Sequence, residues 1–312
     1  MDSRRDFIKF SSALLLGATL PRQVRAASER SPGKISLGFS LYGMKTLPAA
    51  QALSECARIG YRNVELALMT GFPTDPAKLA AADRKAIKEQ VAALGLTVSS
   101  LLVNIALVGD DKAQAAAIET IGFAGQFARE LDPVNPPLIQ TVMGGKPESW
   151  ETLKESMAAR LRAWGVAAAA ANATVAVKGH VAHAVNSPDR LLWIIRETQS
   201  PAIVVAYDHS HFELGGIPME ESWRLLGPQA RFIHVKEAVR EGAAVKFLLA
   251  GEGQTDYRRY FQRLLESGYR GPVVVEVSSQ NFNKPGYDPV KAAESTYAAL
   301  AGPLATASSG RG

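Results

Sequence analysis

The sequence predicts an α/β protein in which one (β/α)8 TIM barrel forms a single domain. First, the length of 312 residues accommodates one barrel, which takes about 250 residues, together with a leader segment. Second, short β-branched runs after residue 33 alternate about eight times with longer amphipathic segments, the pattern of parallel strands joined by helices. Third, no Gly-x-Gly-x-x-Gly loop follows the first run, which argues against an open, doubly wound sheet.

Each expected strand is a short apolar run, and several of them, such as 202–206, are apolar throughout, as in a parallel sheet covered on both faces. The expected strands are 35–41, 63–68, 97–103, 138–143, 174–178, 203–208, 232–236 and 273–277. The expected helices lie near 47–59, 76–94, 111–130, 148–171, 187–199, 218–227, 255–267 and 288–301. The barrel then covers 33–302, and 303–312 are expected to form a flexible tail.

The first 26 residues have the pattern of a twin-arginine signal peptide. Arg4 and Arg5 precede an apolar stretch at 10–20, and Val-Arg-Ala follows as a small-residue cleavage site before Ala27. The apolar stretch is about half of the roughly 20 residues that a spanning helix needs, so no stable membrane span is expected. The pattern predicts export by the twin-arginine machinery to the periplasm or the cell exterior.

Composition and charge narrow the function classes. Hydrophobic residues make up 47% and charged residues 21% of the chain, which is typical of a globular protein with a large core. The full chain has a net charge of +5, but the leader holds five basic and two acidic residues, so +2 remains on the mature part. A net charge this close to zero is not typical of a nucleic-acid-binding protein, which has a strongly basic surface, so no nucleic-acid partner is expected. Cys56 is the only cysteine, which excludes an intrachain disulfide.

Polar residues gather where the expected strands end, which is where a barrel of this kind carries its active site. These residues are Glu65, Lys178, His180, Asp208, His209, His211, His234, Lys236 and Glu276. All five histidines of the chain fall within 180–234, around three consecutive strand ends. Asp208, His234 and Glu276 together offer the oxygen, nitrogen and oxygen ligands that suit Mn, Mg, Co or Zn.

The order and spacing of several short motifs resemble the sugar phosphate isomerase/epimerase group of the xylose isomerase-like superfamily. The motifs are GYRNVEL (60–66), NSP (186–188), VAYDHSHF (205–212), FIHVK (232–236), GEG (251–253) and GYRGPVVVE (268–276). The resemblance implies a divalent metal held by Glu, Asp, His and Glu at the ends of the last four strands, with both glutamates also acting as acid and base. Asp208, His234 and Glu276 match three positions, whereas Lys178 stands where the first glutamate is expected.

Three accounts of Lys178 remain open from the sequence. In the first, His180, two residues on and on the same side of the strand, replaces the missing metal ligand, and Lys178 acts beside the metal as a base or as a stabiliser of an enolate oxygen. In the second, the ammonium of Lys178 occupies the cation position between Asp208 and Glu276. In the third, the site is inactive and the barrel only binds a ligand.

The remaining candidates surround this centre. Glu276 is the expected base, and His211 follows Asp208 in a family-like Asp-x-x-His turn, where it would move a proton, contact substrate or support the metal ligands. Glu65, Lys236 and His180 are expected to bind substrate, although Lys236 could instead neutralise a nearby carboxylate.

These inferences predict an exported enzyme that removes a proton next to the carbonyl of an unphosphorylated sugar or keto-sugar, because phosphorylated sugars are chiefly cytoplasmic. Isomerases, epimerases and lyases or hydratases acting on keto-glycosides share this first step, and the sequence does not separate them. The main alternative is a carbohydrate-binding barrel without turnover. The endonuclease branch of the superfamily is disfavoured by the export signal and by the small net charge.

Overall fold

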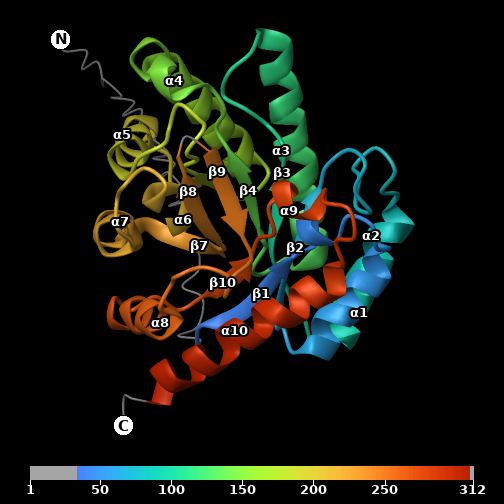
Figure 1. Cartoon of the computed structure of the whole chain (residues 1–312). Coiled ribbons are helices and arrows are strands. Elements are labelled where there is room, and N and C mark those ends of the chain that lie inside the picture. Colours follow the sequence, from blue (N-terminus) through green and yellow to red (C-terminus); the bar gives the residue numbers. More distant parts are fainter. Residues whose placement is uncertain (1–33, 243, 310–312) are drawn as a thin grey trace, which may run out of the picture.

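The computed structural model describes residues 34–242 and 244–309. Eight parallel strands close into a barrel in the order β1-β10-β7-β6-β5-β4-β3-β2. The barrel strands are β1 (Ser36–Ser40), β2 (Asn63–Leu68), β3 (Thr97–Val103), β4 (Leu138–Val142), β5 (Val175–Lys178), β6 (Ile203–Tyr207), β7 (Ala230–Val235) and β10 (Pro272–Val275). Figure 1 shows the long helices arranged outside this barrel. The structure therefore confirms the predicted single (β/α)8 barrel.

Helices follow the barrel strands, and the longer ones cover the outer face of the barrel (Figure 1). They are α1 (Ala49–Ile59), α2 (Ala81–Ala93), α3 (Asp111–Leu131), α4 (Trp150–Ala170), α5 (Pro188–Thr198), α6 (His209–Glu213), α7 (Met219–Leu226), α8 (Tyr257–Glu266), α9 (Ser279–Phe282) and α10 (Pro289–Ser309). Several begin at side-chain caps that the sequence supplies: Asp110 accepts from the Ala113 N–H at the start of α3, and Asp256 accepts from the Arg259 N–H at the start of α8. Short 3-10 turns lie at Leu41–Met44, Pro147–Ser149 and Gly227–Gln229.

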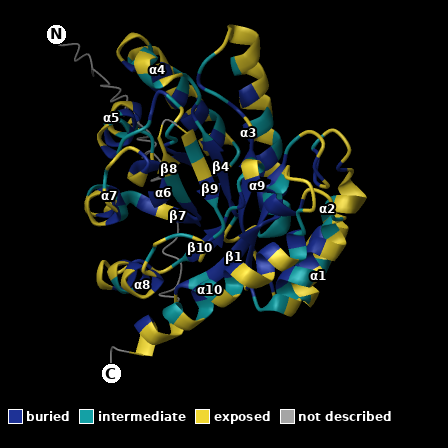
Figure 2. Cartoon of the chain, in the orientation of Figure 1, coloured by how far each residue is buried: buried dark blue, intermediate teal, exposed yellow. Residues whose placement is uncertain are grey.

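The hydrophobic core lies between the barrel and its helices. The strands are buried, while the outward faces of the helices are exposed, as Figure 2 shows by colour. Large side chains such as Trp164, Tyr61 and Phe127 are fully buried in this layer. Burial of apolar surface on this scale is the main force that holds the barrel closed.

Two segments differ from the expected fold. An antiparallel hairpin, β8 (Glu237–Glu241) with β9 (Ala244–Leu248), follows β7 where no element was expected. The predicted flexible tail is wrong for residues 303–309, because α10 continues through Pro303 to Ser309. Its buried residues Leu300 and Ala307 anchor the last turns to the core.

Two further points concern the termini and the membrane. The proposed signal peptide, residues 1–26, lies outside the described part of the chain. Within that part, no helix is both long and apolar enough to cross a bilayer.

Candidate active site at the carboxyl end of the barrel

A cleft of about 660 Å³, open to solvent, lies where the barrel strands end. Its polar lining consists of Tyr42, Asn104, Gln140, Lys178, His180, His183, His211, Lys236, Glu276, Ser278 and Ser279. Its apolar lining consists of Met69, Leu102, Val103, Val142 and Phe247. Lys178 is the last residue of β5, and Lys236 and Glu276 directly follow β7 and β10, so the strand-end rule placed these three residues correctly.

Lys178 lies at the centre of the charged side chains in this cleft. Its Nζ atom lies 2.8 Å from Oε2 of Glu276, 3.3 Å from Oδ2 of Asp208 and 2.9 Å from Nδ1 of His234. Its side chain is only 3% exposed, so these contacts replace hydration almost completely. The structure thus brings Lys178 together with the three residues expected to hold a metal.

A second ammonium contacts the same two carboxylates. Nζ of Lys236 donates to Oδ2 of Asp208 and lies 2.5 Å from Oε2 of Glu276. Lys236 is buried, and its ammonium lies 5.4 Å from the centre of the Phe247 ring. Two positive and two negative side chains therefore form one compact network of hydrogen-bonded charges.

His234 is held from its other side by Glu65. Nε2 of His234 lies 2.9 Å from Oε1 of Glu65, whose oxygens also accept from Ser40 at 2.6 Å and Ser100 at 2.7 Å. Both Glu65 and His234 are fully buried, and neither belongs to the lining of the cleft. Glu65, which was expected to bind substrate, therefore lies behind the lining of the cleft, where it orients His234.

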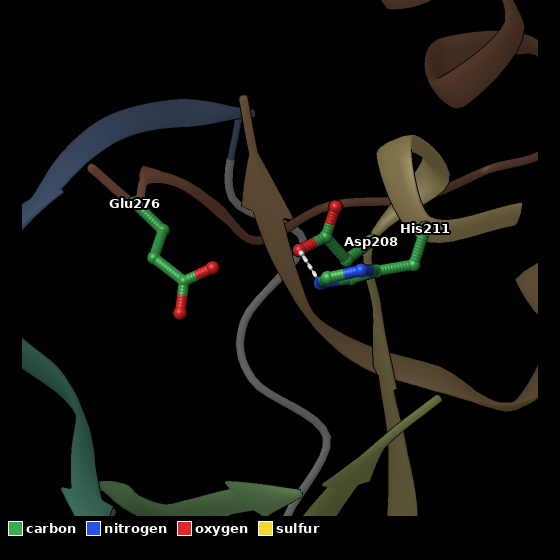
Figure 3. A group of neighbouring side chains, drawn as sticks. All are labelled: Asp208, His211 and Glu276. Atoms are coloured by element: carbon green, nitrogen blue, oxygen red, sulfur yellow. Dashed lines mark ion pairs between the residues drawn. The ribbon is translucent and has the colours of Figure 1, made fainter. Parts of the chain in front are cut away.

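Asp208 connects the charged network to helix α6. Its Oδ1 atom accepts from the hydroxyl of Ser210 at 2.7 Å and from the Ser210 N–H at 3.3 Å, so Asp208 caps this short helix. Its Oδ2 atom faces the two lysines and lies 3.5 Å from Nε2 of His211. Figure 3 shows Asp208 and His211 facing each other, with Glu276 projecting from a separate segment.

The charges of the network change the pKa values of its members. Burial alone would raise the pKa of Asp208 and of Glu276, but the ammonium groups of Lys178 and Lys236 hold both well below the usual range. Burial alone would lower the pKa of Lys178, but the carboxylates of Glu276 and Asp208 outweigh it, so the pKa is raised. Lys178 therefore stays protonated, which does not favour the account in which it acts as a base.

Three histidines form a stack along one wall of the cleft. The ring centres of His180 and His183 lie 4.2 Å apart, and those of His180 and His211 lie 4.1 Å apart. Burial and the charges of nearby residues lower the pKa of His180 to about 3 and that of His211 well below its usual range. These imidazoles are therefore neutral at pH 7, when each can accept one hydrogen bond and donate another.

The metal-ligand set differs from the expected one. Ligand atoms of Asp208, His211 and Glu276 all lie within 4.8 Å of one another, a spacing that allows a divalent metal. His180 is not a member of this group; its Nδ1 atom accepts from the Ala182 N–H at 3.2 Å. The Nδ1 atom of His234 is already paired with Lys178.

These contacts test how well a metal fits the site. A divalent ion bound to Oδ2 of Asp208 and Oε2 of Glu276 would compete with two ammonium groups for the same oxygens. The two lysines already supply the positive charge that these carboxylates need. The residues therefore fit such a site better than the four-ligand metal site that the family resemblance implies.

Some lining residues were not identified from the sequence. Phe247 comes from the β8–β9 hairpin, which is tied to α9 because the Phe247 N–H donates to Gln280 at 3.0 Å and the Phe247 carbonyl accepts from Asn281 at 3.1 Å. Gly242 is a turn signal, and the alternation Val245-Lys246-Phe247 that follows it is a strand signal that could have revealed this element. Gln140, in β4, carries no local signal because it looks like one polar residue in a buried strand.

The fold and the site define a (β/α)8 barrel with a charged cleft at the carboxyl ends of its strands. Residues 53–300 match the family described as xylose isomerase-like TIM barrel, and the chain belongs to that family. Among curated proteins, no match was found.

Solved structures support the same fold at low sequence identity. The chain is similar to the IOLI protein with a bound zinc atom, with a TM-score of 0.74, 17% identity and coverage of 87% of this chain and 99% of that one. It is similar to L-ribulose 3-epimerase, with a TM-score of 0.70, 17% identity and coverage of 88% and 96%. It is also similar to 3-keto-D-glucoside 4-epimerase from E. coli, with a TM-score of 0.67, 15% identity and coverage of 86% and 100%.

Proposed function

We propose that this protein is an exported enzyme that removes a proton next to the carbonyl of an unphosphorylated sugar or keto-sugar. The observation that carries this proposal is the position of Glu276, which lines the cleft beside two ammonium groups. The Oε2 atom of Glu276 accepts a hydrogen bond from each of the two lysines. The Oε1 atom of Glu276 has no hydrogen bond with either lysine. A carboxylate base and a cationic group are thus available at one place.

The chemistry follows from this pairing. Glu276 takes the proton from the carbon next to the carbonyl, and the carbonyl oxygen gains the negative charge of an enediolate, which an ammonium group stabilises. The pKa of Glu276 rises toward a useful value when the ammonium that binds the carbonyl oxygen shares its positive charge with the developing oxygen anion. The proton stays on Glu276 until it is returned, and the neutral imidazole of His211, also on the cleft, can accept a proton on one ring nitrogen while it donates one from the other, which passes a proton between the enediolate oxygens.

The fate of the enediolate separates the reaction types. Return of the proton to the opposite face of the same carbon gives an epimer, and return to the neighbouring carbon with a proton shift between the oxygens gives an isomer. Loss of a substituent from the next carbon gives an elimination product, the lyase reaction. All three use the same first step and the same base.

Two buried acceptors favour a ligand rich in hydroxyl groups. Oε1 of Gln140 and Nδ1 of His183 have no hydrogen-bond partner among the described residues, and both side chains line the cleft. Unpaired buried acceptors are costly, and a sugar hydroxyl would satisfy each one. The two lysines of the cleft are already paired with carboxylates, which does not favour recognition of a phosphate group. The epimerase names of two similar structures agree with a sugar substrate.

The test is a turnover assay with a panel of unphosphorylated ketoses and keto-glycosides, followed by NMR. We expect conversion of at least one sugar, a loss of at least about 100-fold in kcat in Glu276→Gln, and no change in Glu151→Gln, a variant of an exposed residue in α4. Full activity in Glu276→Gln would contradict the assignment of the base. The lyase alternative is recognised by an unsaturated product.

A carbohydrate-binding barrel without turnover is the second candidate, and one observation favours it. Asp208 and Glu276 each contact both lysines, and such a buried set of ion pairs can also form the rigid base of a binding site. Sugar binding measured by calorimetry, without conversion of any bound sugar in the NMR assay, would support this candidate over the enzyme.

Export is proposed on the leader sequence alone. Replacing Arg4 and Arg5 together by lysine should retain the protein in the cytoplasm of a host with a twin-arginine pathway, because that pathway reads the arginine pair. Normal export of this double variant would contradict the assignment, and N-terminal sequencing of exported protein tests cleavage before Ala27.

A further inference from the structure

The ammonium of Lys178 has one acceptor for each of its three N–H donors. The acceptors are Oδ2 of Asp208, Nδ1 of His234 and Oε2 of Glu276, at 3.3, 2.9 and 2.8 Å. They come from three different strand ends and converge on one atom. This is the position at which the same three residues would hold a metal ion.

The hydrogen bonds of His234 determine which of its ring nitrogens carries the proton and which one accepts from Lys178. Nε2 of His234 faces the carboxylate of Glu65, which also accepts from two serine hydroxyls. Because a carboxylate only accepts, Nε2 carries the ring proton and Nδ1 keeps its lone pair. That lone pair can accept from an ammonium or bind a metal, but it cannot do both.

Charge balance leads to the same conclusion. Lys178 and Lys236 together match the charges of Asp208 and Glu276, the two carboxylates that both of them contact. A divalent ion added at these oxygens would lie beside two buried ammonium groups, and like charges at this separation repel strongly in a buried site. The ammonium of Lys178 would have to leave its position between the three acceptors before a metal could bind there, whereas one further carboxylate would offset the charge of Lys236.

We propose that Lys178 and Lys236 are the resident cations of this site and that the site works without a bound divalent metal. Lys178 is a positioning residue whose donors are all used within the protein. Lys236 contacts two acceptors, has one N–H without an acceptor among the described residues, and lines the cleft. In the reaction proposed above, on which this second assignment rests, the third N–H of Lys236 binds the carbonyl oxygen of the sugar.

Elemental analysis of protein purified without a metal-binding tag tests the first assignment. We expect less than about 0.1 equivalent of Mn, Co, Zn or Mg in the wild type and about one equivalent in Lys178→Glu, which restores a four-ligand set. Lys154→Glu, a change in an exposed ion pair of α4, is the matched control and should remain free of metal. About one equivalent in the wild type that is lost in Glu276→Ala would overturn the proposal, and so would a folded Lys178→Glu that takes up no metal.

A second measurement applies if Lys178→Glu does not fold. A protein that binds a metal in its native state melts at a higher temperature when the metal is present, so the wild type should keep the same Tm in about 1 mM Mn, Co, Zn or Mg. A rise in Tm that disappears in Glu276→Ala would overturn the proposal. Both measurements are made without substrate, so they remain decisive even if no sugar is converted, an outcome that contradicts only the proposed function.

The role of Lys236 has its own test in the metal-free enzyme. Lys236→Met should lower kcat by about 100-fold or more because it removes the donor to the oxygen anion. An unchanged kcat in Lys236→Met would overturn the assignment of Lys236 as the donor to the carbonyl oxygen. It would not affect the conclusion that the site binds no divalent metal.

Discussion

Nζ of Lys178 lies 2.8 Å from Oε2 of Glu276, a contact between the ends of β5 and β10 that joins residues 98 positions apart in the chain. Both side chains are almost completely removed from water. A lysine in this position therefore neutralises carboxylates contributed by distant parts of the barrel, and its removal should affect the stability of the whole domain.

Replacing Lys178 with methionine tests this expectation. The variant keeps a side chain of similar length but leaves Asp208 and Glu276 with one cation instead of two, and breaking a buried charge pair costs about 3–5 kcal/mol. We expect a decrease of that size in the free energy of unfolding measured with urea. Lys154→Met, which breaks an exposed pair, should cost less than about 1 kcal/mol. Equal effects of the two substitutions would contradict the buried network.

Gln140 offers a test of the hydroxyl-binding wall. Its Oε1 atom is buried without a partner among the described residues, while its Nε2 atom donates to the Thr141 carbonyl at 3.1 Å. Gln140→Leu therefore removes one unsatisfied acceptor and one hydrogen bond, and these opposed effects should leave the unfolding free energy within about 1 kcal/mol of the wild type. If a sugar hydroxyl donates to the Oε1 atom, KM should increase by about 10-fold, which corresponds to about 1.4 kcal/mol. Steady-state kinetics with the sugar identified in the turnover assay measures KM, and an unchanged KM would show that the substrate does not use Gln140.

His209 predicts a loss of stability in acid. It is fully buried, without a hydrogen-bond partner among the described residues, and burial lowers its pKa to about 4. The unfolded chain takes up a proton on this ring near pH 6.5, whereas the folded protein does not until about pH 4. The stabilisation by the neutral ring is therefore present above pH 6.5 and is lost as the pH falls from 6.5 to about 4.

Urea unfolding at a series of pH values measures this effect. His209→Leu lacks the titrating ring, so between pH 7 and 4 the wild type should lose about 3 kcal/mol more than the variant. His180 and His211 titrate in both proteins and cancel in the comparison. Glu213, whose Oε2 atom lies 3.7 Å from Nε2 of His209 and whose pKa burial raises to about 7, is removed from the comparison by making both proteins in a Glu213→Gln background. The same acid-dependent loss in both proteins would contradict the assignment to His209.

Gly253 tests the loop that links the hairpin to α8. The carboxylate of Glu237 accepts from the Gly251 N–H, the Thr255 N–H and the Tyr257 hydroxyl, and a Cβ atom on Gly253 would collide with it. Gly253→Ala should therefore lower the free energy of unfolding by about 1–3 kcal/mol. Gly122→Ala, in an exposed and open position of α3, should instead raise it by about 0.5–1 kcal/mol. A neutral Gly253→Ala would show that this loop can move away.

The sequence predicted the barrel well because its signals are local. Each parallel strand is a short apolar run, and β2 and β3 were predicted with the bounds that the structure has. The end of α10 was missed because Pro303 and the small residues around it suggest a break, whereas burial of Leu300 and Ala307 keeps these turns helical. The hairpin was missed because it interrupts the expected alternation of strand and helix.

The site was predicted in part for the same reason. Lys178, Asp208 and Glu276 stand at strand ends, so the rule for barrels locates them without knowledge of contacts. Which atom pairs with which depends on tertiary structure: the contact between Glu65 and His234 crosses the barrel interior between residues 169 positions apart. No local sequence pattern encodes that contact. Because Glu65 binds the Nε2 side of the ring, the lone pair on Nδ1 of His234 faces Lys178.

The central claim, removal of a proton next to a carbonyl by Glu276, is tested most directly by solvent exchange. The active sugar is incubated with the wild type in D2O, and deuterium at the carbon next to the carbonyl is followed by NMR in both substrate and product. The account predicts deuterium at that carbon in the wild type and a rate at least about 100-fold lower in Glu276→Gln. Conversion of the sugar without any deuterium incorporation, or exchange at the same rate in Glu276→Gln, would contradict it.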